Sequence, residues 1–275
     1  MNEPPDDPIS SPPEPPLAGR CVVITRPRDQ SGQLHEQLEQ LGARVISFPT
    51  IKIVAARDAS PLEAALERIR QYDWILFTSR NAVDAVARTT KADVAEALSE
   101  VRIAVVGKAT HRCLTGLGIQ ADFVPSQFNM ATLCSELIQE ANLDGQRFLY
   151  PCGDLADAEG PQALRDAGAI VDAIEAYRTI PDDSADADSL RRSLAAEEID
   201  AIVFASPSAV QAFFNKITSH CVSPHVGLVS IGLKTSQALE KAAPGRLTEA
   251  RQAGVEGLIE ALIRALGLRR TQSSR

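Results

Sequence analysis

Asp73–Val83 reads DWILFTSRNAV, and Asp200–Val210 repeats the pattern as DAIVFASPSAV. In both segments an apolar run of strand length ends at small hydroxyl residues, and an Ala-Val pair then begins a helical pattern. Each segment therefore predicts a strand, a tight turn and the start of a helix. Backbone N–H groups at such a turn favour anions. The turns at Thr78–Ser79 and Ala205–Ser206 are thus the first candidates for a binding site.

The composition is that of a soluble globular protein with an acidic surface. A chain of 275 residues, 44% of them hydrophobic, is long enough for two domains. The net charge of −8 and the isoelectric point near 5.1 argue against general binding to nucleic acid or to anionic membranes, which needs a broad positive field. The five cysteines are scattered, with no Cys-x-x-Cys pair, which favours a reducing cytoplasm over a disulfide framework or a zinc site.

The two ends of the chain differ in composition from its middle. The N-terminus lacks a basic region followed by an apolar one, and no apolar run approaches the roughly 18 residues of a membrane span. Residues 1–18 are rich in proline, acidic residues and serine, which predicts a disordered tail. Residues 269–275 are a polar tail. We therefore expect a cytoplasmic protein folded over residues 19–268.

Strand and helix patterns alternate along this folded part, and the second half repeats the first. The pairs that match are separated by 125 to 127 positions; they are Gly19 and Gly145, Gly42 and Gly168, Ser79 and Ser206, Gly107 and Gly232, and Thr110 and Thr235. Alternating strands and helices predict parallel, doubly wound sheets of the Rossmann or flavodoxin-like type. In such sheets ligands bind outside the carboxyl ends of the strands. The expected fold is two similar α/β domains facing a shared cleft.

A set of short segments, in order along the chain, resembles the uroporphyrinogen-III synthase family over about residues 19–268. These segments are Val23–Pro27 (VITRP), Phe77–Ser79 with Asn81–Val83 (FTS and NAV), Val105–Thr110 (VVGKAT), Pro151–Gly153 (PCG), Ala176–Thr179 (AYRT), Phe204–Ser208 (FASPS) and Ile231–Thr235 (IGLKT). Leu233-Lys234 departs from the Pro-Thr that many members have at this turn.

The resemblance implies a domain division that differs from a simple cut near residue 144. In the family the first strand–helix–strand unit belongs with the C-terminal half. Residues 19–49 and 181–268 would then form domain 1, and residues 50–180 would form domain 2. Two strands would link the domains, and the active site would lie in the cleft between them. The sequence alone leaves both divisions open.

The resemblance also implies an activity. The family's members close hydroxymethylbilane, a linear tetrapyrrole, into a ring with inversion of its last pyrrole and loss of water, and they use no cofactor. The expected protein is a monomer with a small-molecule substrate and with no nucleic-acid or membrane partner. The alternative is a catalytically inactive, two-lobed ligand-binding or regulatory module of the same fold.

Candidate site residues follow from the family's substrate, which carries several carboxylates and a hydroxyl that must leave. Tyr177 matches the tyrosine proposed to protonate this hydroxyl; alternatively, it is an ordinary amphipathic residue on a linking strand. Carboxylate contacts are expected from the hydroxyl residues Thr78, Ser79, Thr110, Ser206, Ser208 and Thr235, which otherwise serve as helix N-caps. They are also expected from the cations Arg26, Arg80, Lys108, Arg178 and Lys234, which otherwise are surface charges.

Other site classes have little support. His35, His111, His220 and His225 form no ligand-spaced set, so no metal site is expected. The turns at Gly107 and Gly232 lack the Gly-x-Gly-x-x-Gly fingerprint, which argues against a dinucleotide site.

Overall fold

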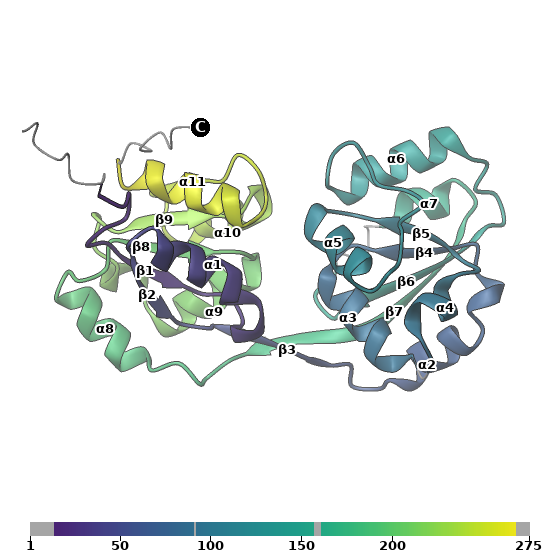
Figure 1. Ribbon diagram of the computed structural model, residues 1–275, viewed down its shortest axis with the longest axis horizontal. Helices are drawn as coiled ribbons and strands as arrows, with labels where there is room; N and C mark the ends of the chain where they lie inside the picture. Colours follow the sequence, from purple (N-terminus) through teal and green to yellow (C-terminus); the bar gives the residue numbers. More distant parts are fainter. Residues whose placement is uncertain (1–13, 91, 157–160, 268–275) are drawn as a thin grey trace, which may run out of the picture. The chain divides into compact units, whose positions relative to one another are not determined.

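The computed structural model describes residues 14–90, 92–156 and 161–267. The chain divides into two compact units: unit 1 is Met1–Ile51 with Pro181–Arg275, and unit 2 is Lys52–Ile180. Each unit has a five-stranded sheet with helices on both faces (Figure 1). The paired strands whose register is resolved are parallel. The predicted α/β class with two doubly wound, parallel sheets is therefore confirmed.

The sheet of unit 1 has the order β10-β9-β8-β1-β2. Its strands are β1 (Cys21–Ile24), β2 (Arg44–Ser47), β8 (Ala201–Phe204), β9 (Gly227–Ser230) and β10 (Leu247–Glu249). Its helices are α1 (Arg28–Gln40), α8 (Ala187–Ala195), α9 (Pro207–Lys216), α10 (Leu233–Ala242) and α11 (Val255–Ala265), with a 3-10 turn at Ser219–Cys221.

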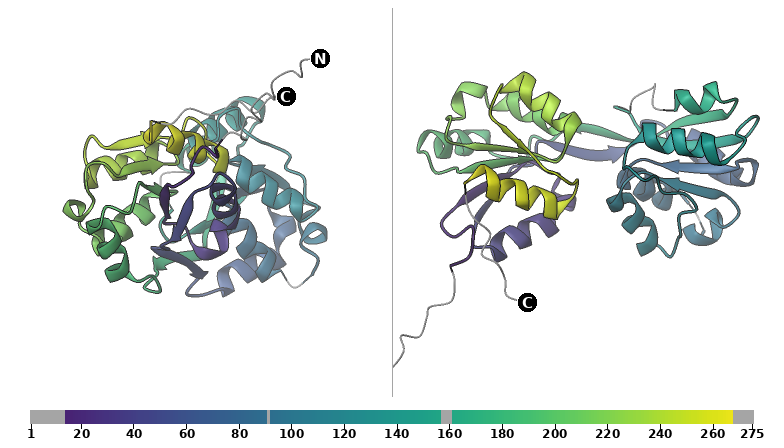
Figure 2. Two further views of the ribbon diagram at one scale, coloured as in Figure 1. Left: turned by 60° about the vertical axis from the view of Figure 1, so that its left-hand side comes forward. Right: turned by 90° about the horizontal axis from the view of Figure 1, so that it is seen from above.

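Alternate residues of the strands supply two cores, one on each face of this sheet. Val22 and Ile24 of β1 pack with α1 and α11 on one face, whereas Cys21 and Val23 pack with α8, α9 and α10 on the other. The right-hand view of Figure 2 shows α1 in purple and α11 in yellow on the same side of the sheet. A strand that is apolar on both faces must be covered on both, which explains the unbroken apolar run of β1.

The sheet of unit 2 has the order β3-β7-β6-β4-β5. Its strands are β3 (Ile51–Ala55), β4 (Trp74–Phe77), β5 (Arg102–Val105), β6 (Arg147–Gly153) and β7 (Ile170–Pro181). Its helices are α2 (Ser60–Glu67), α3 (Arg80–Thr89), α4 (Val94–Leu98), α5 (Lys108–Gly116), α6 (Met130–Glu140) and α7 (Gln162–Asp166), with a 3-10 turn at Ile69–Gln71. Ile75 and Phe77 of β4 pack with α2 to α5, and Trp74 and Leu76 pack with α6 and α7.

The two units match each other in strand order, as the repeat predicts. The neighbours β9-β8-β1-β2 of unit 1 correspond to β5-β4-β6-β7 of unit 2. The repeated glycines also adopt the same backbone, because Gly42 and Gly168 both have φ of +88°, a left-handed conformation that favours glycine after a helix. The two halves of the repeat are, however, used in opposite chain order: β1 precedes β8, whereas the corresponding β6 follows β4.

In each sheet there is a point at which successive strands are added on the opposite side of the first strand. In unit 1 the chain runs outward from β1 to β2 and later resumes on the other side of β1 with β8. In unit 2 it runs from β4 to β5 and resumes on the other side of β4 with β6. Ligands of open α/β sheets bind at such switch points, outside the carboxyl ends of the strands. A ligand site is therefore expected at the carboxyl ends of β1 and β8 in unit 1 and at those of β4 and β6 in unit 2.

The start of the folded chain differs from the prediction. Residues 14–18 were expected within a disordered tail, but the side chain of Leu17 is fully buried in the core of unit 1. Its backbone N–H donates to the Leu41 carbonyl at 2.8 Å. Within residues 14–18 Leu17 is the one large apolar residue, and the proline-rich composition around it hides a single anchoring residue of this kind. The rest of the predicted N-terminal tail, and the tail at 269–275, lie outside the described residues.

None of the helices in the described part of the chain combines the length and the apolar character needed to cross a lipid bilayer. All five cysteines are free thiols.

Candidate functional site

The turn after β4 joins the sheet of unit 2 to the start of α3. Ser79 is the N-cap of α3, and its Oγ accepts the backbone N–H of Ala82 at 3.2 Å. The hydroxyl of Thr78, one residue earlier, lies 3.4 Å from the hydroxyl of Tyr150 on β6. The capping role that was the alternative for Ser79 is therefore present. Capping is not the only contact of this hydroxyl, because Ser79 Oγ has a second hydrogen-bond partner.

That second partner is Tyr177 on β7, whose hydroxyl oxygen lies 3.1 Å from Ser79 Oγ. The Tyr177 side chain packs beside the core formed with α2 to α5. Ser79 and Tyr177 are 98 positions apart in the sequence, so only the sheet order brings them together. The structure thus joins three predicted site residues, Thr78, Ser79 and Tyr177, at the switch point of unit 2.

Burial is the main influence on the acidity of Tyr177. It raises the pKa of the phenol above its ordinary value of 10, and the nearby Cys152 and Asp154 act in the same direction. Hydrogen bonds from Ser79 and Asn81 oppose this rise in pKa. Both of these groups stabilise the phenolate when they donate to the Tyr177 oxygen. The result is a phenol that keeps its proton at neutral pH.

Arg80 follows Ser79 in the first turn of α3. Its Nε lies 3.5 Å from Oδ2 of Asp84, one helical turn further on, and the side chain is 42% exposed. Asp84 also accepts the thiol of Cys113 at 3.4 Å. Arg80 is therefore near the predicted site, but part of its charge is already balanced.

The turn after β5 carries Gly107, Lys108 and Thr110. Gly107 is the N-cap of α5 with φ of +94°, and no side chain caps this helix. Capping is therefore not the role of Thr110, whose side chain is buried. The ammonium of Lys108 lies 5.6 Å from the ring centroid of Phe128, a phenylalanine that is 45% exposed. An ammonium group and an exposed aromatic ring beside it can together bind a planar ligand that carries a negative charge.

Arg178 follows Tyr177 on β7 and is half-buried. Its Nε is buried and makes no hydrogen bond to any part of the chain that the structure describes. An arginine without a partner for such a nitrogen can pair with an anion.

The matching edge of unit 1 has the same cap geometry. Ser206 is the N-cap of α9; its Oγ accepts the N–H of Ala209 at 3.1 Å and lies 3.0 Å from Oγ of Ser208. At the end of β1, the buried hydroxyl of Thr25 donates to the Val203 carbonyl and so ties β1 to β8. Arg26 follows at this edge and is half-buried. Ser206, Ser208 and Arg26 thus belong to the switch point of unit 1.

The turn after β9 leads into α10, whose N-cap is Gly232. Thr235 is buried here, as Thr110 is in unit 2, and no side chain caps the helix. Leu233, beside Lys234, is 66% exposed. The buried Ser230 hydroxyl lies 2.6 Å from that of Ser236, which in turn donates to Glu249. This chain of hydrogen bonds fixes the start of α10, on which Lys234 and Thr235 lie.

Several residues at these edges were not predicted from the sequence. They are Tyr150, Gly153 and Phe128 in unit 2, and Ser230, Ser236 and Glu249 in unit 1. The segment PCG at Pro151–Gly153 was noted as a motif, but its glycine was given no role. The local sequence signal for Phe128 was a phenylalanine directly before the N-cap Asn129, and only the structure shows that its ring is exposed.

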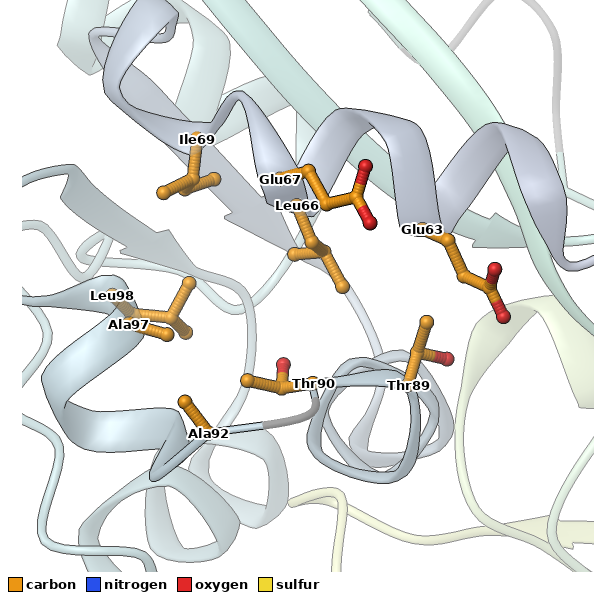
Figure 3. Close-up of a pocket in the computed structure, with 9 residues that line it drawn as sticks. All are labelled: Glu63, Leu66, Glu67, Ile69, Thr89, Thr90, Ala92, Ala97 and Leu98. Atoms are coloured by element: carbon orange, nitrogen blue, oxygen red, sulfur yellow. The ribbon is translucent and has the colours of Figure 1, made fainter.

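A cavity of about 170 Å³ lies elsewhere in unit 2 (Figure 3). Leu66 and Ile69 point into it from α2 and the following turn, opposite Ala97 and Leu98 of α4. Thr89 and Thr90 line it at the C-terminal end of α3, whereas the predicted site lies at the N-terminal end of that helix. Ten helical residues span about 15 Å, so the cavity is separate from the predicted site.

Among the described residues, no group of three or more His, Cys, Asp or Glu side chains is arranged to hold a metal ion.

Comparison with known proteins was made for both sequence and structure. A family model described as uroporphyrinogen-III synthase HemD matches residues 32–260. The chain is 32% identical over 263 residues to a uroporphyrinogen-III synthase of Synechococcus elongatus, covering 90% of this chain and 96% of the relative. It is 30% identical over 227 residues to one of Chlorobaculum parvum, covering 81% of this chain and 89% of the relative.

Two solved structures share the fold at low sequence identity. A mutant uroporphyrinogen III synthase of Thermus thermophilus superposes with a TM-score of 0.60 at 18% identity, covering 90% of this chain and 99% of that one. A uroporphyrinogen-III synthetase of Helicobacter pylori gives a TM-score of 0.58 at 15% identity, with coverage of 89% and 99%.

Proposed function

Because the chain belongs to the uroporphyrinogen-III synthase family, we propose that it closes hydroxymethylbilane into uroporphyrinogen III, with inversion of ring D and loss of one water. The protein is then an enzyme of tetrapyrrole biosynthesis, the route to haem. By reaction it is a hydro-lyase, and the chemistry requires no cofactor. Once the hydroxyl has left, the azafulvene that remains is already an electrophile, so the protein need not supply a nucleophile.

Tyr177 is the proposed general acid, and its contact with Ser79 is the observation that carries this assignment. When Ser79 and Asn81 donate their hydrogen bonds to the phenol oxygen, the phenol proton remains available to a ligand. Burial keeps the phenol protonated at neutral pH. Tyr177 can therefore deliver a proton to the leaving hydroxyl, which departs as water.

Positioning of the substrate supplies the larger part of the rate. A general acid contributes about 10²–10⁴-fold, whereas holding the reacting groups in place can be worth about 7–11 kcal/mol. Carboxylates suit hydroxyls, helix N-termini and cations. The proposed substrate-binding residues are Arg26, Thr78, Ser79, Arg80, Lys108, Thr110, Arg178, Ser206, Ser208, Lys234 and Thr235.

Phe128 extends the proposed site beyond these predicted residues. Its exposed ring lies beside Lys108, which supports contact with a pyrrole ring whose carboxylate meets the ammonium. Aromatic faces and cations together bind such groups by stacking and charge.

The proposed location rests on the composition, and the proposed monomeric state rests on the family resemblance. We expect a cytoplasmic monomer: the five free thiols suit a reducing compartment, and the net negative charge disfavours binding to nucleic acid and to anionic membranes. As functional domains we take residues 19–49 with 181–268, and residues 50–180.

One assay tests the function. Purified protein is given freshly made hydroxymethylbilane, and the ring isomers are separated by chromatography after oxidation to porphyrins. The proposal expects the type III isomer, formed faster than the ring closes without protein. Formation of the type I isomer alone, at the uncatalysed rate, would leave a ligand-binding module of the same fold as the explanation.

A further inference from the structure

Gly153, the last residue of β6, lies directly against the ring of Tyr177. A β-carbon placed on Gly153 would be 2.7 Å from both Cε2 and Cζ of Tyr177 and 2.9 Å from its hydroxyl oxygen. Real β-carbons do not approach other atoms this closely, so a side chain here would force the ring to move. The backbone of Gly153 is not left-handed. What this position requires is therefore the absence of a side chain rather than the flexibility of glycine.

A bulge in β7 turns Tyr177 towards Gly153. Cys152 pairs with Glu175, whereas the next residue, Gly153, pairs with Tyr177, so Ala176 is the extra residue. Successive side chains of a regular strand point to opposite faces. Here Ala176 and Tyr177 pack beside the same core, as expected when one residue is inserted. Beyond the bulge, the Asp154 N–H donates to the Tyr177 carbonyl at 3.1 Å and holds the two strands together.

We propose that Gly153 is a positioning residue, whose missing side chain lets the Tyr177 ring lie against β6 and places its hydroxyl at Ser79. For ordinary contact with a β-carbon, the ring would have to retreat from 2.7 Å to at least 3.4 Å. The hydroxyl sits 3.1 Å from Ser79 Oγ, so a retreat of that size away from Ser79 breaks the hydrogen bond. The geometry stands by itself, and its effect on turnover rests on the proposed function.

The first test reads the position of Tyr177 without any turnover. The protein contains three tyrosines, and ¹³C labelling of their rings gives separate NMR signals. Tyr177 is identified by the signal that Tyr177→Phe removes. In Gly153→Ala we expect this signal to shift and its pKa to fall towards 10, because the displaced ring loses the burial that raises it. The signals of Tyr72 and Tyr150 should stay where they are in the native protein.

A matched control is Gly116→Ala. Gly116 belongs to the same unit, at the end of α5, and a β-carbon there has no neighbour within 4 Å. This variant should leave all three tyrosine signals in place. An unmoved Tyr177 signal in correctly folded Gly153→Ala would overturn the inference, whatever the activity.

The second test reads turnover. In Gly153→Ala we expect kcat to fall about 10–100-fold with KM changed by less than about twofold, since a misplacement of about 1 Å can cost 10²-fold. In a Tyr177→Phe background the same substitution should change kcat by less than about twofold, because no hydroxyl is left to misplace. An equal loss in both backgrounds would contradict the positioning role. A moved Tyr177 signal in a protein whose native form has no turnover would uphold the positioning and reject the proposed function.

Discussion

At the scale of single residues, removing the hydroxyl of Tyr177 is the most direct test of its proposed role as general acid. The pKa of this phenol is raised by burial, so it is protonated below pH 10 and loses its proton only above that value. Tyr177→Phe should lower kcat by about 10²-fold while retaining turnover, because positioning remains. The native kcat should fall as the pH rises above 10, and this alkaline limb should be missing in the variant. Steady-state kinetics across pH check both outcomes.

Complete loss of turnover in correctly folded Tyr177→Phe would contradict the larger share assigned to positioning. The same raised pKa has a consequence for stability with a definite sign. The protonated phenol is favoured in the folded protein, so its contribution is fully present below pH 10 and is lost as the pH rises through the folded pKa.

Arg80 and Pro207 occupy equivalent positions, one after each capping serine. Only Arg80 can attract a carboxylate, although Asp84 at 3.5 Å offsets part of its charge. Exposed charge pairs are worth about 0.2–1 kcal/mol, so Arg80→Ala should raise KM by no more than about fivefold. Pro207→Ala is the matched control and should change KM by less than about twofold. Equal KM values in the two variants would remove Arg80 from the site.

At the scale of elements, the N-cap of α3 has two tasks that substitutions can separate. Ser79→Ala removes the cap of α3 and should lower the free energy of unfolding by about 1 kcal/mol. It also removes the contact with Tyr177, so kcat should fall as well. Asp93 caps α4 in the same unit, and its carboxylate accepts the backbone N–H groups of Ala95 and Glu96. Asp93→Ala should lose similar stability in urea unfolding and keep its kcat. A Ser79→Ala enzyme with native kcat would mean that capping is the whole role of Ser79.

The sequence predicts these turns well because their chemistry is local. An apolar run followed by a hydroxyl and a helical pattern identifies both Ser79 and Ser206, and the two caps have nearly the same backbone angles. What surrounds them is not local. Tyr150 lies 72 positions from Thr78, and nothing near Gly153 in the sequence indicates that the ring of Tyr177 will cover it. The bulge at Ala176 has no local signal either, so the sequence identifies Tyr177 but cannot say how it is aimed.

At the scale of the whole molecule, the sequence predicts the features that both halves of the repeat share, but not those that depend on contacts between distant segments. The repeat of 125 to 127 positions predicts two similar sheets, and the parallel α/β architecture is confirmed. The repeat does not predict that corresponding strands follow opposite orders along the chain in the two units, with β1 before β8 but β6 after β4. A repeat of 125 to 127 positions is compatible with either domain division. Leu17 was missed for a related reason, since it is buried against Leu34 and Leu38 of α1 and hydrogen-bonded to the Leu41 carbonyl, 24 positions away.

Unit 2 is continuous in the chain and has a core on each face of its sheet. A fragment of residues 52–180 should therefore fold alone, with a cooperative unfolding transition and dispersed NMR signals. The Tyr177 signal should titrate as it does in the full chain, because Ser79 and Gly153 belong to the same unit. The fragment should not convert hydroxymethylbilane, since it lacks the proposed contacts of Ser206 and Lys234. An unstructured fragment would show that unit 2 depends on the rest of the chain.

The pairing of β1 with β8 also delays the folding of unit 1 during protein synthesis. Val22 is paired with Ala201, so the central strand of unit 1 leaves the ribosome long before its neighbour has been made. At about 5–20 residues per second, that interval is roughly 9–36 seconds. All of unit 2 is made within it and can fold first. During the wait, β1, α1 and β2 expose apolar surface that α11 and β8 will later cover, which makes the nascent first segment the natural client of a chaperone.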